Sequence, residues 1–370
     1  MSDISTPAAP LTPVWDLGVR VFHWTLALTV GLAAATGFLG EAETLTLHIT
    51  AGLIAAGLVL ARIVWGIFGP THARFADFWP RLPAIRAHLA GADSRHLGHN
   101  PLGALMVLAM LAAVLALAAT GLVVLGGVLR LGPLAADFGT DAGFGAREIH
   151  ELIAFCVLAL IVAHLGGVIF ESRRSRENLA RAMLTGLKES RPGDSVANPA
   201  PARTILALLI IGALATSLLT ANAALTARPV PGLPVAQIDP TTAAECGACH
   251  MAYPPSLLPA ASWHALMAGL PDHFGEDASL DPATAAQIET WLTANAAETV
   301  ETLPARIFAR TNAAAPFTLT ETPAWKRIHG DLPEALFARK SVAGRSNCAA
   351  CHPDATAGRF SPFAIAIPKE

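Results

Sequence analysis

The segment EIHELIAFCVLALIVAHLGGVIF, residues 148–170, decides the fold of this chain. A helix needs about 20 apolar residues to cross the hydrocarbon core of a bilayer, and this segment is long enough to do so. It nevertheless contains two histidines, His150 and His164. Because ionisable side chains inside a membrane are costly and usually functional, the two histidines predict a site within the membrane.

The composition indicates a membrane protein that carries a second, soluble unit. Of the 370 residues, 53% are hydrophobic and 14% are charged, against about 25% charged residues in an ordinary soluble protein. The formal net charge of −3 gives no indication of a nucleic-acid partner. Apolar stretches of spanning length occur at 20–40, 47–68, 101–126, 149–170 and 204–222.

The basic residues predict the orientation of these spans. The loop at 69–100 contains four arginines, and the stretch ESRRSRENLARAMLTGLKESR at 171–191 is strongly basic. Since positively charged loops stay on the cytoplasmic side, both stretches are expected there. The N-terminus would then be cytoplasmic and the C-terminal region periplasmic, in a bacterial inner membrane.

Two CxxCH motifs occur in the C-terminal region, CGACH at 246–250 and CAACH at 348–352. This motif attaches haem c, because two thiols add across the haem vinyl groups and the adjacent histidine becomes an axial iron ligand. The alternatives are a pair of disulfides or a zinc site, and the presence of two such frames favours haem. The predicted thioether residues are Cys246, Cys249, Cys348 and Cys351, and the predicted proximal ligands are His250 and His352.

The second axial ligand of each haem c is left open by spacing alone. Histidine would give a lower potential than methionine. The candidates are His264, His273 and His329, with Met251 and Met267 behind them.

The histidines of the spans fall into two layers. His150 and His164 are about 21 Å apart along a helix and nearly four turns apart, so both project from one face. His48 opens the second span and can meet His150, whereas His23 lies early in the first span and can meet His164. Two imidazoles that face each other inside a bundle form a site for non-covalent haem b. The sequence therefore predicts two haems b.

Other polar residues receive weaker assignments. Arg20 and Arg147 lie near the two layers and are candidates to pair with haem propionates, with interfacial anchoring as the alternative. Packing within the span is the favoured role of Cys156. The histidines expected not to bind iron are His72, His88, His96 and His99.

The first half of the chain resembles the bacterial cytochrome b561 family. The resemblance covers about residues 12–190 and is carried by WDLGVRVFHW, HITAG, GHNPLGA and the EIHE…AHLGG span. It implies a four-helix membrane cytochrome with two haems b that exchanges electrons with quinone. The family's four ligand histidines correspond to His23, His48, His150 and His164.

The region from about 240 to the end resembles the diheme cytochrome c family. The likeness is carried by CGACHMAYPPSLLPAASW, LPDHFGEDASLDP, ETPAWKRIHG and SNCAACHPDA. It implies bis-histidine haems with His273 and His329 as distal ligands, without fixing which serves which haem. His264 matches no ligand position of that family.

Together these features predict an all-α protein with a four-helix haem b bundle, a fifth tethering helix and a small helical and loop diheme cytochrome c domain. The expected domains are 1–190, a linker with the fifth span at 191–235, and 236–370. An A-x-A frame at 221–223 leaves cleavage of the fifth span as an alternative to an uncleaved anchor.

The combined resemblance implies electron transfer between the quinone pool and a soluble periplasmic haem protein, for which an oxygen- or ligand-binding cytochrome c is one candidate. The alternatives are a superoxide oxidase-type enzyme that reduces quinone and a haem-bearing anchor subunit of a larger oxidoreductase.

Overall fold

The computed structural model describes residues 10–91, 95–192, 194, 201–309 and 317–369. The chain divides into two compact units: unit 1, Met1–Gly121 with Ala146–Ala223, and unit 2, Leu122–Gly145 with Ala224–Glu370. Within the predicted linker, residues 193 and 195–200 lie outside the described part.

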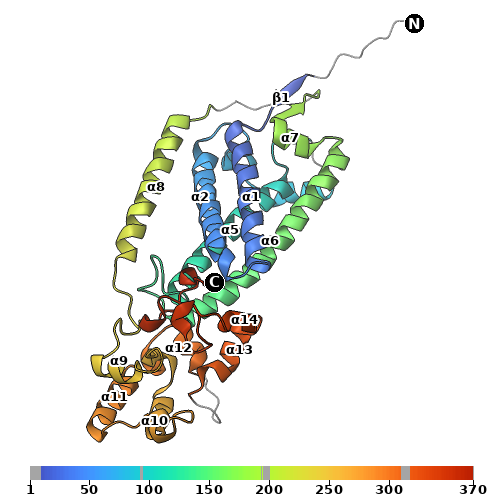
Figure 1. Ribbon diagram of the computed structural model, residues 1–370. Coiled ribbons are helices and arrows are strands. Elements are labelled where there is room, and N and C mark those ends of the chain that lie inside the picture. Colours follow the sequence, from blue (N-terminus) through green and yellow to red (C-terminus); the bar gives the residue numbers. More distant parts are fainter. Residues whose placement is uncertain (1–9, 92–94, 193, 195–200, 310–316, 370) are drawn as a thin grey trace. The chain divides into compact units, whose positions relative to one another are not determined.

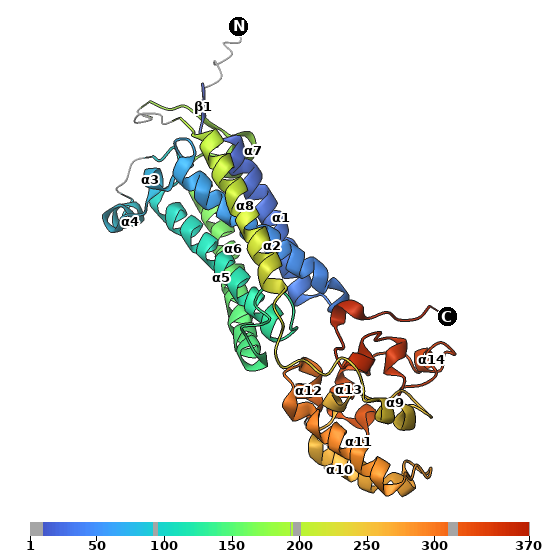
Figure 2. The ribbon, with the colours of Figure 1, turned by 90° about the vertical axis from the view of Figure 1, so that its left-hand side faces the viewer.

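In the described part, five helices are long and apolar enough to cross a membrane. The helices α1, α2, α5 and α6 run side by side (Figures 1 and 2). The predicted mainly helical fold with membrane-spanning helices is therefore confirmed. These helices are α1 (Leu17–Phe38), α2 (Leu45–Phe68), α5 (Pro101–Gly127), α6 (Thr140–Ser175) and α8 (Thr204–Thr226).

Local side-chain chemistry fixes where these helices begin. The carboxylate of Asp16 accepts a hydrogen bond from the Val19 amide at 3.1 Å and caps α1. At the start of α5, the Asn100 side chain accepts from the Gly103 amide at 2.6 Å, and Pro101 occupies the first turn. Both caps satisfy amides that have no partner within the helix.

Small and branched residues let the spans of unit 1 pack closely. Ala55 and Val59 of α2 are buried against Leu111 and Val114 of α5, with Phe22 of α1 packed on the same cluster. Without a hydrophobic driving force between helices in lipid, such van der Waals contact is a main source of association. These contacts therefore help to hold α1, α2 and α5 together.

One end of unit 1 is closed by a two-stranded ribbon and three short helices. Strand β1 (Leu11–Pro13) pairs antiparallel with β2 (Leu187–Glu189), with Leu11 opposite Glu189. The ribbon was not predicted, because three residues show too little alternation to indicate a strand. The short helices are α3 (Phe75–Phe78), α4 (Leu82–Leu89) and α7 (Leu179–Thr185).

Unit 2 is built from short helices joined by loops. Asp239, Asp281, Thr302 and Thr322 each cap a helix that has proline in its first turn, an arrangement that favours helix initiation. The helices are α9 (Pro240–Cys246), α10 (Ala260–Ala268), α11 (Pro282–Ala294), α12 (Leu303–Phe308), α13 (Pro323–His329) and α14 (Glu334–Phe337).

The connection between α5 and α6 is bound to distant parts of unit 2. The buried guanidinium of Arg130 donates to the carbonyl of Pro231. Arg228 donates to Asp137 through both terminal nitrogens, one of them at 2.9 Å. These bonds join segments about a hundred positions apart in the sequence and explain why residues 122–145 group with the C-terminal region.

The main core of unit 2 lies between α10 and α11. Trp263, Met267, Ile288 and Leu292 are buried there. The Trp263 indole nitrogen donates to the carbonyl of Pro255 at 2.8 Å, so its polar atom is satisfied inside the core.

We expect Ile288→Ala to lower the free energy of unfolding of unit 2 by about 2–5 kcal/mol, because Ile288 is fully buried and leaves a cavity. Ile328→Ala is the matched control, since that side chain is 55% exposed. Pulse proteolysis of the full chain across a urea series would measure both. Equal urea midpoints for the two variants would contradict the placement of Ile288.

Candidate haem-binding sites

The structure brings the four histidines of the spans together in the two predicted layers. The ring centres of His23 on α1 and His164 on α6 lie 6.3 Å apart. Those of His48 on α2 and His150 on α6 lie 6.1 Å apart. Since α6 is one continuous helix from Thr140 to Ser175, a single element contributes one imidazole to each layer.

The histidines of unit 2 form two further pairs. His250 of the first CxxCH frame lies 6.3 Å from His273, with the rings inclined by 29°. His352 of the second frame lies 6.2 Å from His329, with the rings inclined by 76°. The structure thus associates one distal candidate with each frame, a pairing that spacing left open.

These separations fit an iron between each pair of rings. A metal–imidazole bond is about 2 Å long, and the ring centre lies about 1 Å beyond the nitrogen, so two such ligands in line put the centres about 6 Å apart. The residues present therefore fit a haem iron with two axial imidazoles.

The hydrogen bonds of the rings leave the outer nitrogen available. Nδ1 of His48 lies 2.9 Å from the carbonyl of Ala33, and Nδ1 of His150 lies 3.0 Å from that of Leu117. Because a carbonyl oxygen only accepts, Nδ1 must carry the proton and Nε2 keeps its lone pair for a metal. His250 and His329 are fixed in the same way, by the carbonyls of Met251 and Trp325 at 2.7 and 3.2 Å.

Burial supports the neutral form of the rings in unit 2. Burial lowers the pKa of His273, with the nearby His250 adding to the effect. It also lowers the pKa of His329 and of His352. Neutral imidazole is the form that binds a metal.

A fifth histidine pair shows why separation alone is insufficient. The rings of His88 and His96 also lie 6.3 Å apart. However, Nε2 of His88 faces Arg174 at 3.4 Å and Glu171 at 4.0 Å. Its outer nitrogen is therefore engaged by charged side chains of α6, and the pair has no CxxCH frame.

The tetrapeptide AATG occurs twice and holds the two imidazoles of one layer. It spans 34–37 and 118–121. Thr120 Oγ1 lies 3.0 Å from Nδ1 of His150, and Thr36 Oγ1 lies 3.5 Å from that of His48. The glycine that follows each threonine lets the ring approach the backbone. Sequence reasoning missed these residues, although the repeat itself was a visible signal.

The thiols of both frames are free, so the structure forms no disulfide between them. Burial raises the pKa of Cys246 and of Cys351, and raises that of Cys348 to about 11. Among the described residues, no group of three or more histidines, cysteines and acidic residues is arranged to hold a metal ion. Protonated, unpaired thiols suit thioether formation, in which the S–H bond adds across a vinyl group.

The remaining candidates make other contacts. His264 is exposed and forms an ion pair with Glu289, and Met267 is buried in the core of unit 2. Arg147 is also exposed and pairs with Glu151 at 2.8 Å. Arg20 donates to the carbonyl of Leu184 at 2.7 Å, while its Nε is buried without a partner.

Comparisons with known proteins agree with this division. The family model of prokaryotic cytochrome b561 matches residues 14–186, and that of dihaem cytochrome c matches residues 242–360. A probable Ni/Fe-hydrogenase B-type cytochrome subunit of Cupriavidus necator is 26% identical over 212 residues, which cover 48% of this chain and 86% of that protein. The protein of the same name from Rhizobium leguminosarum is 25% identical over 215 residues, which cover 47% of this chain and 87% of that protein.

Two solved structures match the C-terminal region. The diheme cytochrome c from Rhodobacter sphaeroides is 48% identical, covering 34% of this chain and 98% of that chain, with a TM-score of 0.29. A diheme cytochrome c from Shewanella baltica is 37% identical and also has a TM-score of 0.29. The match covers 35% of this chain and 92% of that chain.

The protein is therefore a membrane haem protein of electron transport. It has a cytochrome b561 N-terminal region fused to a C-terminal dihaem cytochrome c domain. The first family implies b haems and the second implies two c haems.

We expect Gly37→Val to lower the ratio of b haem to c haem in the purified protein. A Cβ at Gly37 would lie 3.0 Å from Cε1 of His48, so the branched side chain displaces that ring. Gly212→Val on α8 is the control, because a Cβ there meets no atom within 4 Å. Pyridine haemochrome spectra give the ratio, and an unchanged ratio in Gly37→Val would show that the ring does not need this glycine.

Proposed function

We propose that the chain carries four haems and transfers electrons between the quinone pool and a periplasmic haem protein. One haem b would be held by His23 and His164 and the other by His48 and His150. Two haems c would be attached at the CxxCH frames, with His273 opposite His250 and His329 opposite His352. The observation that carries the proposal is the recurrence of four pairs of imidazoles whose ring centres lie about 6 Å apart.

The protein's part in this function is to hold and insulate the electron carriers. A haem iron supplies reversible one-electron exchange. Two imidazole ligands close the iron to oxygen and other small molecules, so that electron transfer is favoured over ligand chemistry. The Nδ1–carbonyl bonds of His48, His150, His250 and His329 fix those four rings, which would limit reorganisation when the iron changes charge. Helix α6 sets the b sites about 21 Å apart along one axis.

The orientation follows from the distribution of basic residues. The stretches at 69–100 and 171–191 together contain nine arginines, which supports a cytoplasmic location for them. The His23–His164 layer would then be cytoplasmic-side and the His48–His150 layer periplasmic-side. The dihaem region would lie in the periplasm, where a soluble haem protein, such as an oxygen- or ligand-binding cytochrome c, could exchange electrons with it.

A second candidate is a haem-bearing membrane subunit of a larger oxidoreductase. The names of the relatives from Cupriavidus necator and Rhizobium leguminosarum, which describe B-type cytochrome subunits of a Ni/Fe-hydrogenase, favour it. A large partner that co-purifies at fixed stoichiometry would support this assignment. Oxidation of quinol by the isolated chain, without a partner subunit, would support the first candidate, direct electron transfer from the quinone pool.

The deciding experiment is a potentiometric titration followed by stopped-flow mixing with quinol. Quinol should reduce the b haems first and the c haems second, because electrons would enter in the membrane. Reduction of the c haems without any change in the b haems would contradict the proposed route.

We expect two extractable haems b and two covalent haems c per chain. His164→Ala should remove the haem of the His23–His164 layer, and His150→Ala should remove the haem of the other layer, since each loses an axial ligand. Acid-acetone extraction with pyridine haemochrome spectra would count them. Two b haems retained in both variants would mean that these histidines are structural.

We expect His273→Ala and His329→Ala each to open one haem c to carbon monoxide, because the iron would lose its sixth ligand. His264→Ala is the control, since its ring is exposed and paired with Glu289. Difference spectra of the reduced protein would detect the bound gas. If neither variant gains carbon monoxide binding, the distal assignments are wrong.

A further inference from the structure

A buried arginine inside the membrane has no assigned role. Arg62 lies in α2 and is 3% exposed. One terminal nitrogen donates to the carbonyl of Ala73 at 2.9 Å, while the other, Nη1, is buried without a partner. The guanidinium also lies over the rings of Phe75 and Phe22, with centroids at 5.1 and 6.0 Å. A buried charge is stable only when it is paired, so this geometry calls for an anion.

The nearby carboxylate of Asp16 is already used by other donors. One of its oxygens accepts from the Val19 amide at 3.1 Å, and the other accepts from the Trp65 indole at 3.4 Å. Asp16 affects Arg62 electrostatically, but it leaves Nη1 unbonded. The anion that Arg62 requires is therefore not supplied by this side chain.

Other unpartnered nitrogens lie in the same region of unit 1. Nδ1 of His99 and Nε2 of His72 are both buried without partners. The His99 ring is fixed between Trp15 and Phe78, with centroids at 4.7 and 4.3 Å. The backbone of His72 has a left-handed φ of 72°. Residues other than glycine rarely adopt this conformation, and it often marks a functional position.

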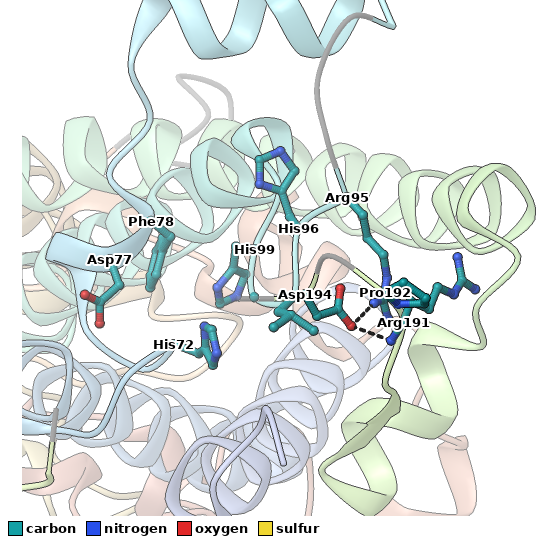
Figure 3. Close-up of a pocket in the computed structure, with 11 residues that line it drawn as sticks. His72, Asp77, Phe78, Arg95, His96, His99, Arg191, Pro192 and Asp194 are labelled. Atoms are coloured by element: carbon teal, nitrogen blue, oxygen red, sulfur yellow. Dashed lines mark hydrogen bonds and ion pairs between the residues drawn. The ribbon is translucent and has the colours of Figure 1, made fainter. Parts of the chain in front are cut away.

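Electrostatics link this group to the nearer histidine layer. Burial lowers the pKa of His99 to about 3, and Arg62, Lys188, His72 and His164 contribute further. His99 therefore lies within electrostatic range of both Arg62 and the imidazole of His164. His72 and His99 also line a cavity of about 620 Å³ (Figure 3).

We propose that Arg62, together with His99 and His72, binds a propionate carboxylate of the haem held by His23 and His164. The inference rests on the proposed function, which places a haem there. A propionate would supply the missing anion, because guanidinium–carboxylate pairs are strong, charge-assisted hydrogen bonds. Phe22, which Arg62 covers, is the sequence neighbour of His23, so the arginine is at the right end of the spans.

The arginine would also set the potential of that haem. A fixed positive charge beside the porphyrin disfavours the ferric state, which carries one more positive charge than the ferrous state. Arg62 should therefore raise the midpoint potential of this haem and leave the other b haem unchanged.

The test is a potentiometric titration of the full chain in membranes. Arg62→Gln should lower the preference of one b haem for the reduced state about tenfold, a shift of about 59 mV for one electron. Arg62→Lys keeps the charge and should shift it less. Arg173→Gln removes an exposed arginine near the end of α6 and should leave both potentials unchanged, because exposed charges are screened.

Three outcomes would overturn the inference. They are unchanged b-haem potentials in Arg62→Gln, equal shifts of both b haems, and loss of the same b haem in both the Gln and Lys variants while the c haems remain. Loss in Arg62→Gln with retention in Arg62→Lys would support it, because charge alone would then hold the haem.

Two further measurements separate the possible errors. Resonance Raman should show a shift of the propionate bending mode in Arg62→Gln, and no shift would count against direct contact. If instead the parent's potential changed with phosphate concentration, a free anion would occupy the arginine and the inference would fail. The failure of the proposed function is distinct, since both b haems would then survive His23→Ala and His164→Ala.

Discussion

The hydrogen bond from an imidazole Nδ1 to a backbone carbonyl orients at least one ring in three of the four histidine pairs. It recurs at His48 and His150 on helices of unit 1, at His329 in α13 and at His250 in a loop of unit 2. In each case it fixes the tautomer and aims Nε2 away from the backbone. A histidine with the same ring separation but an engaged Nε2, such as His88, lacks this property. The chemistry of the site is thus set by which nitrogen is occupied.

The membrane makes this interaction possible in unit 1. Helical carbonyls are normally bonded within their own helix, but they retain a second lone pair that a neighbouring helix can use. A ring reaches that lone pair only where the facing side chain is small. The glycine and alanine residues around Thr36 and Thr120 meet this requirement, and they also allow the van der Waals contact that holds helices together in lipid.

Much of the fold and of the sites could be predicted from sequence, because the relevant signals are local. Hydropathy predicts the spans, CxxCH predicts covalent haem attachment, and the fourteen-residue spacing on one helix predicts the two histidine layers. The pairing of His273 with His250 could not be predicted by spacing, since loops of unit 2 bring them together. Arg62 was missed for another reason. A single arginine in an apolar run looks like a span terminus until the structure shows that it is buried.

The grouping of residues 122–145 with the C-terminal region affects the order in which the protein can form. Arg130 and Asp137 are synthesised long before Pro231 and Arg228, with α6 and α8 in between. The segment 122–145 can form these bonds only after residues 228–231 have been synthesised, and contacts between residues far apart in the sequence form slowly. Unit 2 is therefore complete only after the last long helix has been made.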